Sequence, residues 1–148
     1  MVKAAYSTGA PAYGVGLGNA AHVVDETADL DDAAQMIANS KTFDCATSCL
    51  ADHSVAAHSS IYETLKRKLV ERGGHVCASP EKSRLQAVMW PKGERIPSIE
   101  VVAKPAARIA ELAGIELAPD RTFLEKAFFE AGAALEKPGV AAMVWRHF

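Results

Sequence analysis

Short apolar segments alternate with amphipathic helical patterns along most of this chain, and this alternation restricts the fold more than any other feature. Strands are predicted over 21–24, 54–57, 75–77 and 140–145. Helices are predicted over 29–43, 61–72, 79–90 and 105–113. Strands that alternate with helices of this length are typical of an α/β fold with a largely parallel sheet. We therefore predict one α/β domain.

Local signals mark the ends of several of these helices. Asp29 is predicted as the N-cap of the first helix, and Ser79 as the N-cap of a later one, with Pro80 at its first position. Gly73 is expected to end the helix before it, and Gly114 to end the last predicted helix. These signals fix the helix boundaries within a few residues.

Composition narrows the classes of protein to consider. The 148 residues suit one domain, and 49% of them are hydrophobic, which is ordinary for a globular fold. The 16 basic residues are offset by 18 acidic ones, which argues against a nucleic-acid partner. No apolar run reaches the ~18–20 residues of a membrane span, so we expect no membrane partner. Three cysteines form a poor disulfide framework, and we expect a cytoplasmic protein with reduced thiols.

The glycines at positions 14, 16 and 18 suggest a dinucleotide-binding fingerprint, but their context differs. That fingerprint follows a strand and opens a helix. Here the glycines run into the apolar segment 21–24, which is predicted to be a strand. We therefore interpret them as a turn in which backbone packs closely.

The segment 44–53 concentrates the residues with the most reactive side chains. A thiolate is a strong nucleophile toward carbonyl carbon, whereas a cysteine in a small domain is more often a buried apolar residue. Cys45, Cys49 and His53 are spaced four apart, so in a helix they would share one face and could hold zinc. The fourth ligand would be His58, His75 or Cys77. The paired Cys-x2-Cys spacing of strong zinc sites is absent, so we predict no metal ligand and keep zinc binding as an alternative.

Five segments together resemble the aldehyde dehydrogenase superfamily. They are, in chain order, 14–19 (GVGLGN), 24–30 (VDETADL), 40–44 (SKTFD), 46–49 (ATSC) and 89–91 (MWP). The resemblance is to the coenzyme A-acylating branch, and within it to acylating sulfoacetaldehyde dehydrogenases. It covers residues 1–124, while residues 125–148 diverge from the pattern.

The resemblance implies a function and one catalytic residue, Cys49. Its thiolate would attack an aldehyde to give a thiohemiacetal, hydride would pass to NAD or NADP, and the resulting thioester would pass to coenzyme A. The backbone N–H of Cys49 would be one oxyanion donor. Cys45 occupies a position at which relatives often carry asparagine. The partners expected from this resemblance are a small-molecule aldehyde and coenzyme A, and cofactor-binding residues stay unassigned.

The residue at position 15 supports the acylating branch. Hydrolytic members carry a glutamate base near the position of Val15, and valine cannot activate water. A thioester without such a base would persist until coenzyme A attacks it.

The resemblance also implies the domain organisation. We expect residues 1–148 to form the three-layer catalytic domain alone, without the nucleotide-binding domain that precedes it in the family. Such a fragment is expected to form homo-oligomers, to bind NAD(P) weakly and to be incomplete as an enzyme. The alternatives are a non-catalytic remnant that self-associates and the small zinc-binding domain described above.

Overall fold

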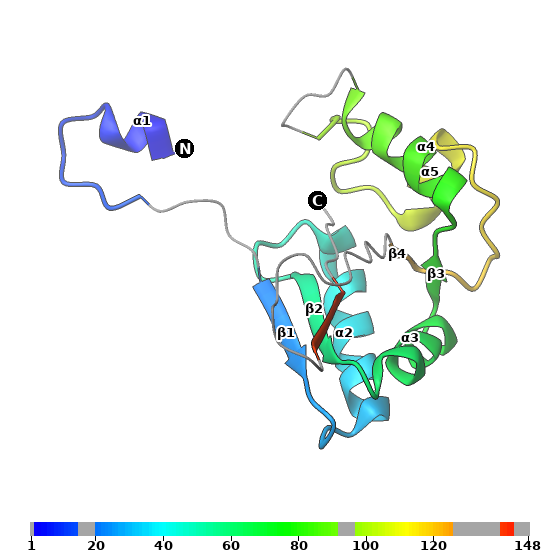
Figure 1. Ribbon diagram of the computed structural model, residues 1–148. Coiled ribbons are helices and arrows are strands. Elements are labelled where there is room, and N and C mark those ends of the chain that lie inside the picture. Colours follow the sequence, from blue (N-terminus) through cyan, green and yellow to red (C-terminus); the bar gives the residue numbers. More distant parts are fainter. Residues whose placement is uncertain (1, 15–19, 92–96, 126–139, 144–148) are drawn as a thin grey trace.

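The computed structural model describes residues 2–14, 20–91, 97–125 and 140–143 (Figure 1). Its helices are α1 (Val2–Tyr6), α2 (Leu30–Thr42), the 3-10 turn η1 (Phe43–Ala46), α3 (Tyr62–Glu71), α4 (Ser79–Met89) and α5 (Ala106–Leu112). Its strands are β1 (Ala20–Val24), β2 (Asp52–His58), β3 (Gly74–Val76), β4 (Phe123–Glu125) and β5 (Val140–Met143). The predicted alternation of strands and helices is confirmed.

The strands form two small sheets. β1 and β2 are parallel, and β5 joins β2 in the antiparallel direction to complete a sheet of order β1-β2-β5. β3 and β4 form a separate parallel pair. The chain is therefore α/β, as predicted, with antiparallel pairing only at β5 among the described strands.

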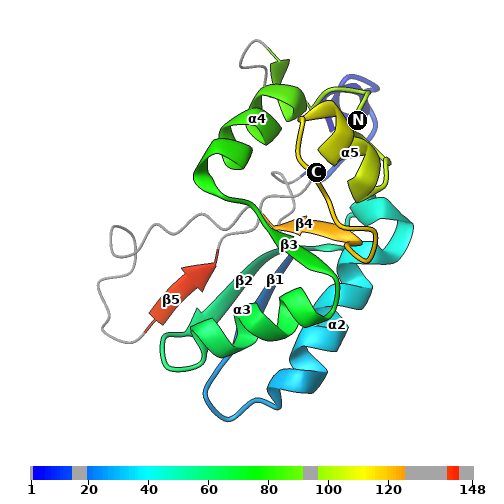
Figure 2. The ribbon, with the colours of Figure 1, turned by 90° about the vertical axis from the view of Figure 1, so that its right-hand side faces the viewer.

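Helices cover both faces of the β3–β4 pair. Phe123 belongs to an apolar cluster formed mainly by α2, α3, β1 and β2, whereas Leu124 belongs to a second cluster formed mainly by α4 and α5. Neighbouring residues of a strand point to opposite faces, which explains how β4 contributes to both clusters. Figures 1 and 2 show this pair between the two groups of helices. The predicted three-layer arrangement therefore forms around β3 and β4.

The helix ends show how local sequence signals act. The Asp29 carboxylate accepts hydrogen bonds from the amides of Asp31 (2.9 Å) and Asp32 (3.2 Å), which confirms it as an N-cap. After α3, Gly73 adopts φ +97°, and a Cβ there would lie 2.7 Å from Thr122 Oγ1. Only glycine fits this turn without displacing a neighbour.

The predicted N-cap at Ser79 is wrong. Ser79 is the first residue of α4, and Ala78 is the capping residue. The Glu81 carboxylate reaches back to accept a hydrogen bond from the Ala78 amide at 2.7 Å, so the cap does not need a polar side chain at its own position.

No helix in the described part of the chain is both long and apolar enough to span a membrane.

Candidate functional site

The backbone before Cys49 forms a left-handed turn. Asp44, Cys45 and Ala46 have φ angles of 49°, 51° and 56°, although none is glycine. The Thr47 amide donates a hydrogen bond to the Asp44 carbonyl at 3.0 Å, which closes the turn. Left-handed backbone costs an L-residue about 1–2 kcal/mol. Consecutive residues of this kind concentrate at functional sites, where the surrounding fold holds them in place.

Cys49 lies in a second turn, formed by residues 48–51 and called the Cys49 turn below, which leads into β2. The Ser48 carbonyl accepts a hydrogen bond from the Ala51 amide at 3.0 Å, and Ser48 Oγ accepts one from the Leu50 amide at 3.3 Å. The Cys49 side chain is exposed. Within the described part of the chain, no hydrogen bond involves the Cys49 amide. Among the described residues, nothing occupies the hydrogen-bonding position of this N–H, and the sulfur is exposed.

The Cys49 turn meets the start of β1 at one edge of the sheet. Ala20, the first residue of β1, pairs with Asp52, the first residue of β2. The chain therefore enters both parallel strands from the same side. The predictions for positions 15, 16 and 18 concern the segment before β1 and lie outside the described residues.

A group of charged side chains lies beneath the Cys49 turn. Asp52 Oδ1 is 2.8 Å from His22 Nδ1, and the Asp52 amide donates a hydrogen bond to Ser40 Oγ at 3.0 Å. These contacts join β1, α2 and β2. Lys41 is only 3% exposed, and burial lowers its pKa to about 8, although the charge of Asp52 opposes that shift. Sequence reasoning assigned no role to Lys41 or Asp52, because neither burial nor their proximity shows in a local pattern.

A pocket of about 490 Å³ lies between the end of α2, the start of α5 and β4. Cys45 is among its lining residues, but Cys49 is not. The basic residues that line it are Lys41, Arg72, Lys104 and Arg121. Arg72 and Arg121 also contact carboxylates outside the lining, those of Asp31 (3.7 Å) and Asp120 (3.3 Å). The described residues of the lining itself include no acid, so its charge favours an anionic group such as a phosphate.

The helical face that zinc binding by Cys45, Cys49 and His53 required does not form. Cys45 lies in the left-handed turn, Cys49 in the following turn and His53 in β2. Their spacing of four residues therefore does not place them on one face of a helix. His58, a proposed fourth ligand, instead contacts Ser60 Oγ through Nδ1 at 2.8 Å.

The fold and the Cys49 turn agree with the comparison to known families. The model of the aldehyde dehydrogenase family matches residues 9–84, a segment that contains both turns. The chain belongs to the aldehyde dehydrogenase family. The predicted family resemblance is therefore confirmed.

Members of the acylating branch are similar to this chain. The acylating sulfoacetaldehyde dehydrogenase of Cupriavidus necator is 45% identical over 115 residues, which cover 78% of this chain and 23% of that protein. An acetylating aldehyde dehydrogenase from Geobacillus thermoglucosidasius has a TM-score of 0.79 at 37% identity, and the match covers 88% of this chain and 28% of that one.

A further solved structure contains a modified cysteine. Propionaldehyde dehydrogenase of Rhodopseudomonas palustris, with bound CoA and an acylated cysteine, has a TM-score of 0.71 at 31% identity. That match covers 83% of this chain and 28% of the other. The present chain thus spans about a quarter of the length of each of these three relatives.

Proposed function

We propose that this chain is the cysteine-bearing catalytic domain of an aldehyde dehydrogenase that acylates coenzyme A, and that Cys49 is its nucleophile. The observation that carries the proposal is made in the Cys49 turn. There the thiol of Cys49 is exposed, and the backbone amide of the same residue makes no hydrogen bond in the described structure. A nucleophile must be reachable by its substrate, and an oxyanion needs a free donor beside it. Cys49 provides both at one position.

The chemistry assigned to Cys49 is acyl transfer through its sulfur. The thiol gives up its proton, and the thiolate forms a bond to the carbonyl carbon of the aldehyde. The Cys49 N–H stabilises the negative charge that develops on the carbonyl oxygen. When bound, NAD or NADP supplies the hydride acceptor, and coenzyme A supplies the thiol that takes the acyl group. The bond between Cys49 sulfur and the acyl carbon then breaks, and Cys49 is restored.

The basic pocket supports an anionic ligand near this site. Both dinucleotides and coenzyme A carry phosphates, and four basic side chains line the pocket. The pocket reaches Cys45, four residues before Cys49. We assign it to an anionic part of the cofactor or the substrate. The likeness to sulfoacetaldehyde dehydrogenases makes a sulfonate-bearing aldehyde one candidate.

Two further parts of the proposal concern the setting of the domain. We propose that it acts in the cytoplasm, where its thiols stay reduced. We also propose that it forms homo-oligomers. The support is exposed apolar surface, since Val23 on β1 is 81% exposed and Leu50 in the Cys49 turn is 82% exposed.

Acyl transfer to Cys49 tests the proposal without any nicotinamide. The protein is mixed with acetyl-CoA or sulfoacetyl-CoA, and its intact mass is measured over time. The acyl group moves from the CoA sulfur to the Cys49 sulfur, while the Cys49 proton passes to the released CoA thiolate. We expect one added acyl group that peptide mapping places on Cys49.

Cys45→Ala is the matched control, because Cys45 is also an exposed thiol and lies four residues away. Cys45→Ala should still gain one acyl group on Cys49, whereas Cys49→Ala should gain none. Equal labelling of the two cysteines would indicate unassisted thiol chemistry and contradict the proposal. So would the absence of any adduct on protein that circular dichroism shows to be folded, and it would favour the non-catalytic remnant.

A further inference from the structure

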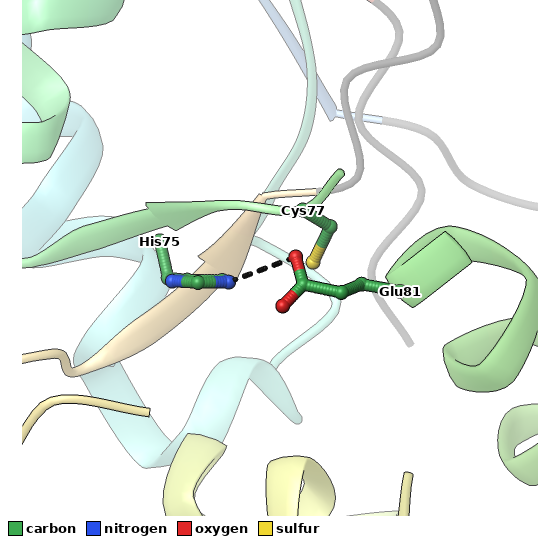
Figure 3. Close-up of side chains that lie close together, drawn as sticks. All are labelled: His75, Cys77 and Glu81. Carbon is green, nitrogen blue, oxygen red and sulfur yellow. Dashed lines mark hydrogen bonds and ion pairs between the residues drawn. The ribbon is translucent and has the colours of Figure 1, made fainter. Parts of the chain in front are cut away.

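Three side chains of different chemistry meet where β3 leads into α4. The His75 imidazole, the Cys77 thiol and the Glu81 carboxylate have their ligand atoms within 4.8 Å of one another. Figure 3 shows the Glu81 carboxylate directed toward both the imidazole and the sulfur. His75 Nε2 lies 3.2 Å from Glu81 Oε2. Among the described residues, these form the one group of three or more such side chains placed to share a metal ion.

The backbone sets this arrangement. His75 lies in β3 and Cys77 directly follows the strand, so they are two positions apart, with Val76 between them. Residues two apart on extended backbone project to the same side. Ala78 is also extended and leads into α4, and the first turn of the helix brings Glu81 back toward the strand. A hydrogen bond of 2.7 Å from the Ala78 amide to Glu81 Oε2 holds the carboxylate there.

Burial differs across the cluster in a way that suits a bound ion. Cys77 is 2% exposed and packs in the apolar cluster of α4 and α5. The side chains of His75 and Glu81 are 23% and 19% exposed. The sulfur is therefore enclosed, while the other two ligands reach solvent, from which a metal ion and a water molecule would enter.

The donor set favours zinc over other common divalent cations. Imidazole nitrogen, thiolate sulfur and carboxylate oxygen are the three ligand types that Zn²⁺ binds, at about 2.0–2.3 Å. Mg²⁺ and Ca²⁺ prefer oxygen ligands alone. The Ala78 amide donates a hydrogen bond of 2.7 Å to the Glu81 carboxylate and so orients a possible oxygen ligand. A backbone amide that orients a ligating carboxylate is a common feature of metal sites.

We propose that His75, Cys77 and Glu81 bind one Zn²⁺ ion, with water as the fourth ligand, and that the ion fastens β3 to the start of α4. On binding, the Cys77 thiol releases its proton to solvent, and two bonds to the metal replace the hydrogen bond between His75 and Glu81. The site is independent of the proposed acyl transfer, which uses none of these residues. It would add metal bonds to elements that the described structure already joins through the His75–Glu81 contact and the Ala78 amide.

Cobalt titration tests the site, because Co²⁺ takes the place of Zn²⁺ and absorbs light. The protein carries Cys45→Ser and Cys49→Ser, which leaves Cys77 as the one thiol in the sequence. After removal of metal with a chelator, Co²⁺ is added and the absorption spectrum is recorded. We expect one equivalent to bind with a thiolate-to-cobalt charge-transfer band, and one equivalent of Zn²⁺ to abolish that band.

Variants of the three ligands identify the site. Cys77→Val keeps an apolar side chain in the core and should remove the charge-transfer band. His75→Gln and Glu81→Gln keep hydrogen-bonding side chains and should each weaken binding at least about tenfold. His58→Gln, a control outside the cluster, should leave the affinity unchanged. The proposal would be overturned if the folded protein showed no charge-transfer band with Co²⁺. It would also be overturned if neither His75→Gln nor Glu81→Gln weakened the binding of Co²⁺.

Discussion

Lys41 offers a direct test of the charge arrangement beneath the Cys49 turn. The residue is 3% exposed, and within the described structure its buried Nζ has no hydrogen-bond partner. Burial of a charge without a partner costs free energy, which is why its pKa falls from 10.5 to about 8. Replacement by methionine keeps the length of the side chain and removes the charge. We expect Lys41→Met to stabilise the fold at neutral pH.

The magnitude follows from the difference in pKa between the folded and unfolded states. That difference is about 2.5 pH units, and at ~1.36 kcal/mol for each unit it corresponds to about 3 kcal/mol. Between pH 8 and 10.5 the unfolded chain binds the proton that the folded chain has lost, so Lys41 makes the free energy of unfolding rise with pH in this window. Below pH 8 the full cost is present.

Urea denaturation at pH 7, 8, 9 and 10 measures the effect, with the fluorescence of the two tryptophans, Trp90 and Trp145, as the probe. Other groups titrate in this range in both proteins. The informative quantity is therefore the difference in free energy of unfolding between wild type and Lys41→Met at each pH. Lys41→Met should be more stable by about 3 kcal/mol at pH 7, and the difference should approach zero near pH 10.5.

Lys104→Met is the matched control, because Lys104 lines the same pocket but is exposed. The free energy of unfolding of Lys104→Met should differ from that of wild type by a small and constant amount over the whole pH range. Parallel stability profiles of wild type and Lys41→Met would refute the reasoning, since they would mean that the buried ammonium is stabilised as well in the folded protein as in water.

Two other substitutions test local features of the fold. Asp29→Ala removes the carboxylate that caps α2 and should cost about 1 kcal/mol in urea denaturation; an unchanged midpoint would mean that the cap contributes nothing. Cys45→Asn places a residue that tolerates left-handed backbone at φ 51° and should raise the free energy of unfolding by about 0.5–1 kcal/mol. A loss of stability there would show that the thiol makes contacts that outweigh the backbone strain.

The helices could be predicted well because their signals are local. The carboxylate of Asp29 and the glycine at position 73 act on backbone within three residues, so each helix end is encoded where it occurs. Ser79 failed as a cap for a similarly local reason, since Glu81 already satisfies the amide of Ala78. In contrast, β4 has only three residues and exists as a strand because β3 lies beside it. Nothing within those three residues reveals their partner.

The candidate site could be predicted in part. The segment 46–49 led to the prediction of Cys49 through its likeness to a family, and this residue lies within the 9–84 segment that the family model matches. The left-handed turn at 44–46 could not be foreseen, because none of the three residues is glycine. The spacing of Cys45, Cys49 and His53 suggested a shared helical face, and the turn removes it.

The sequence by itself determined most of the segments that become helices and strands and where most of the helices end, and it led to the proposal of Cys49 as the nucleophile. These properties depend on periodicity and on contacts between residues a few positions apart. Only the tertiary structure decided that Asp52 meets His22, that Lys41 is buried beside them, and that Glu81 joins His75 and Cys77. Such pairings depend on strand register, on the path of the chain between elements and on the exclusion of water, which the chain establishes only when it packs.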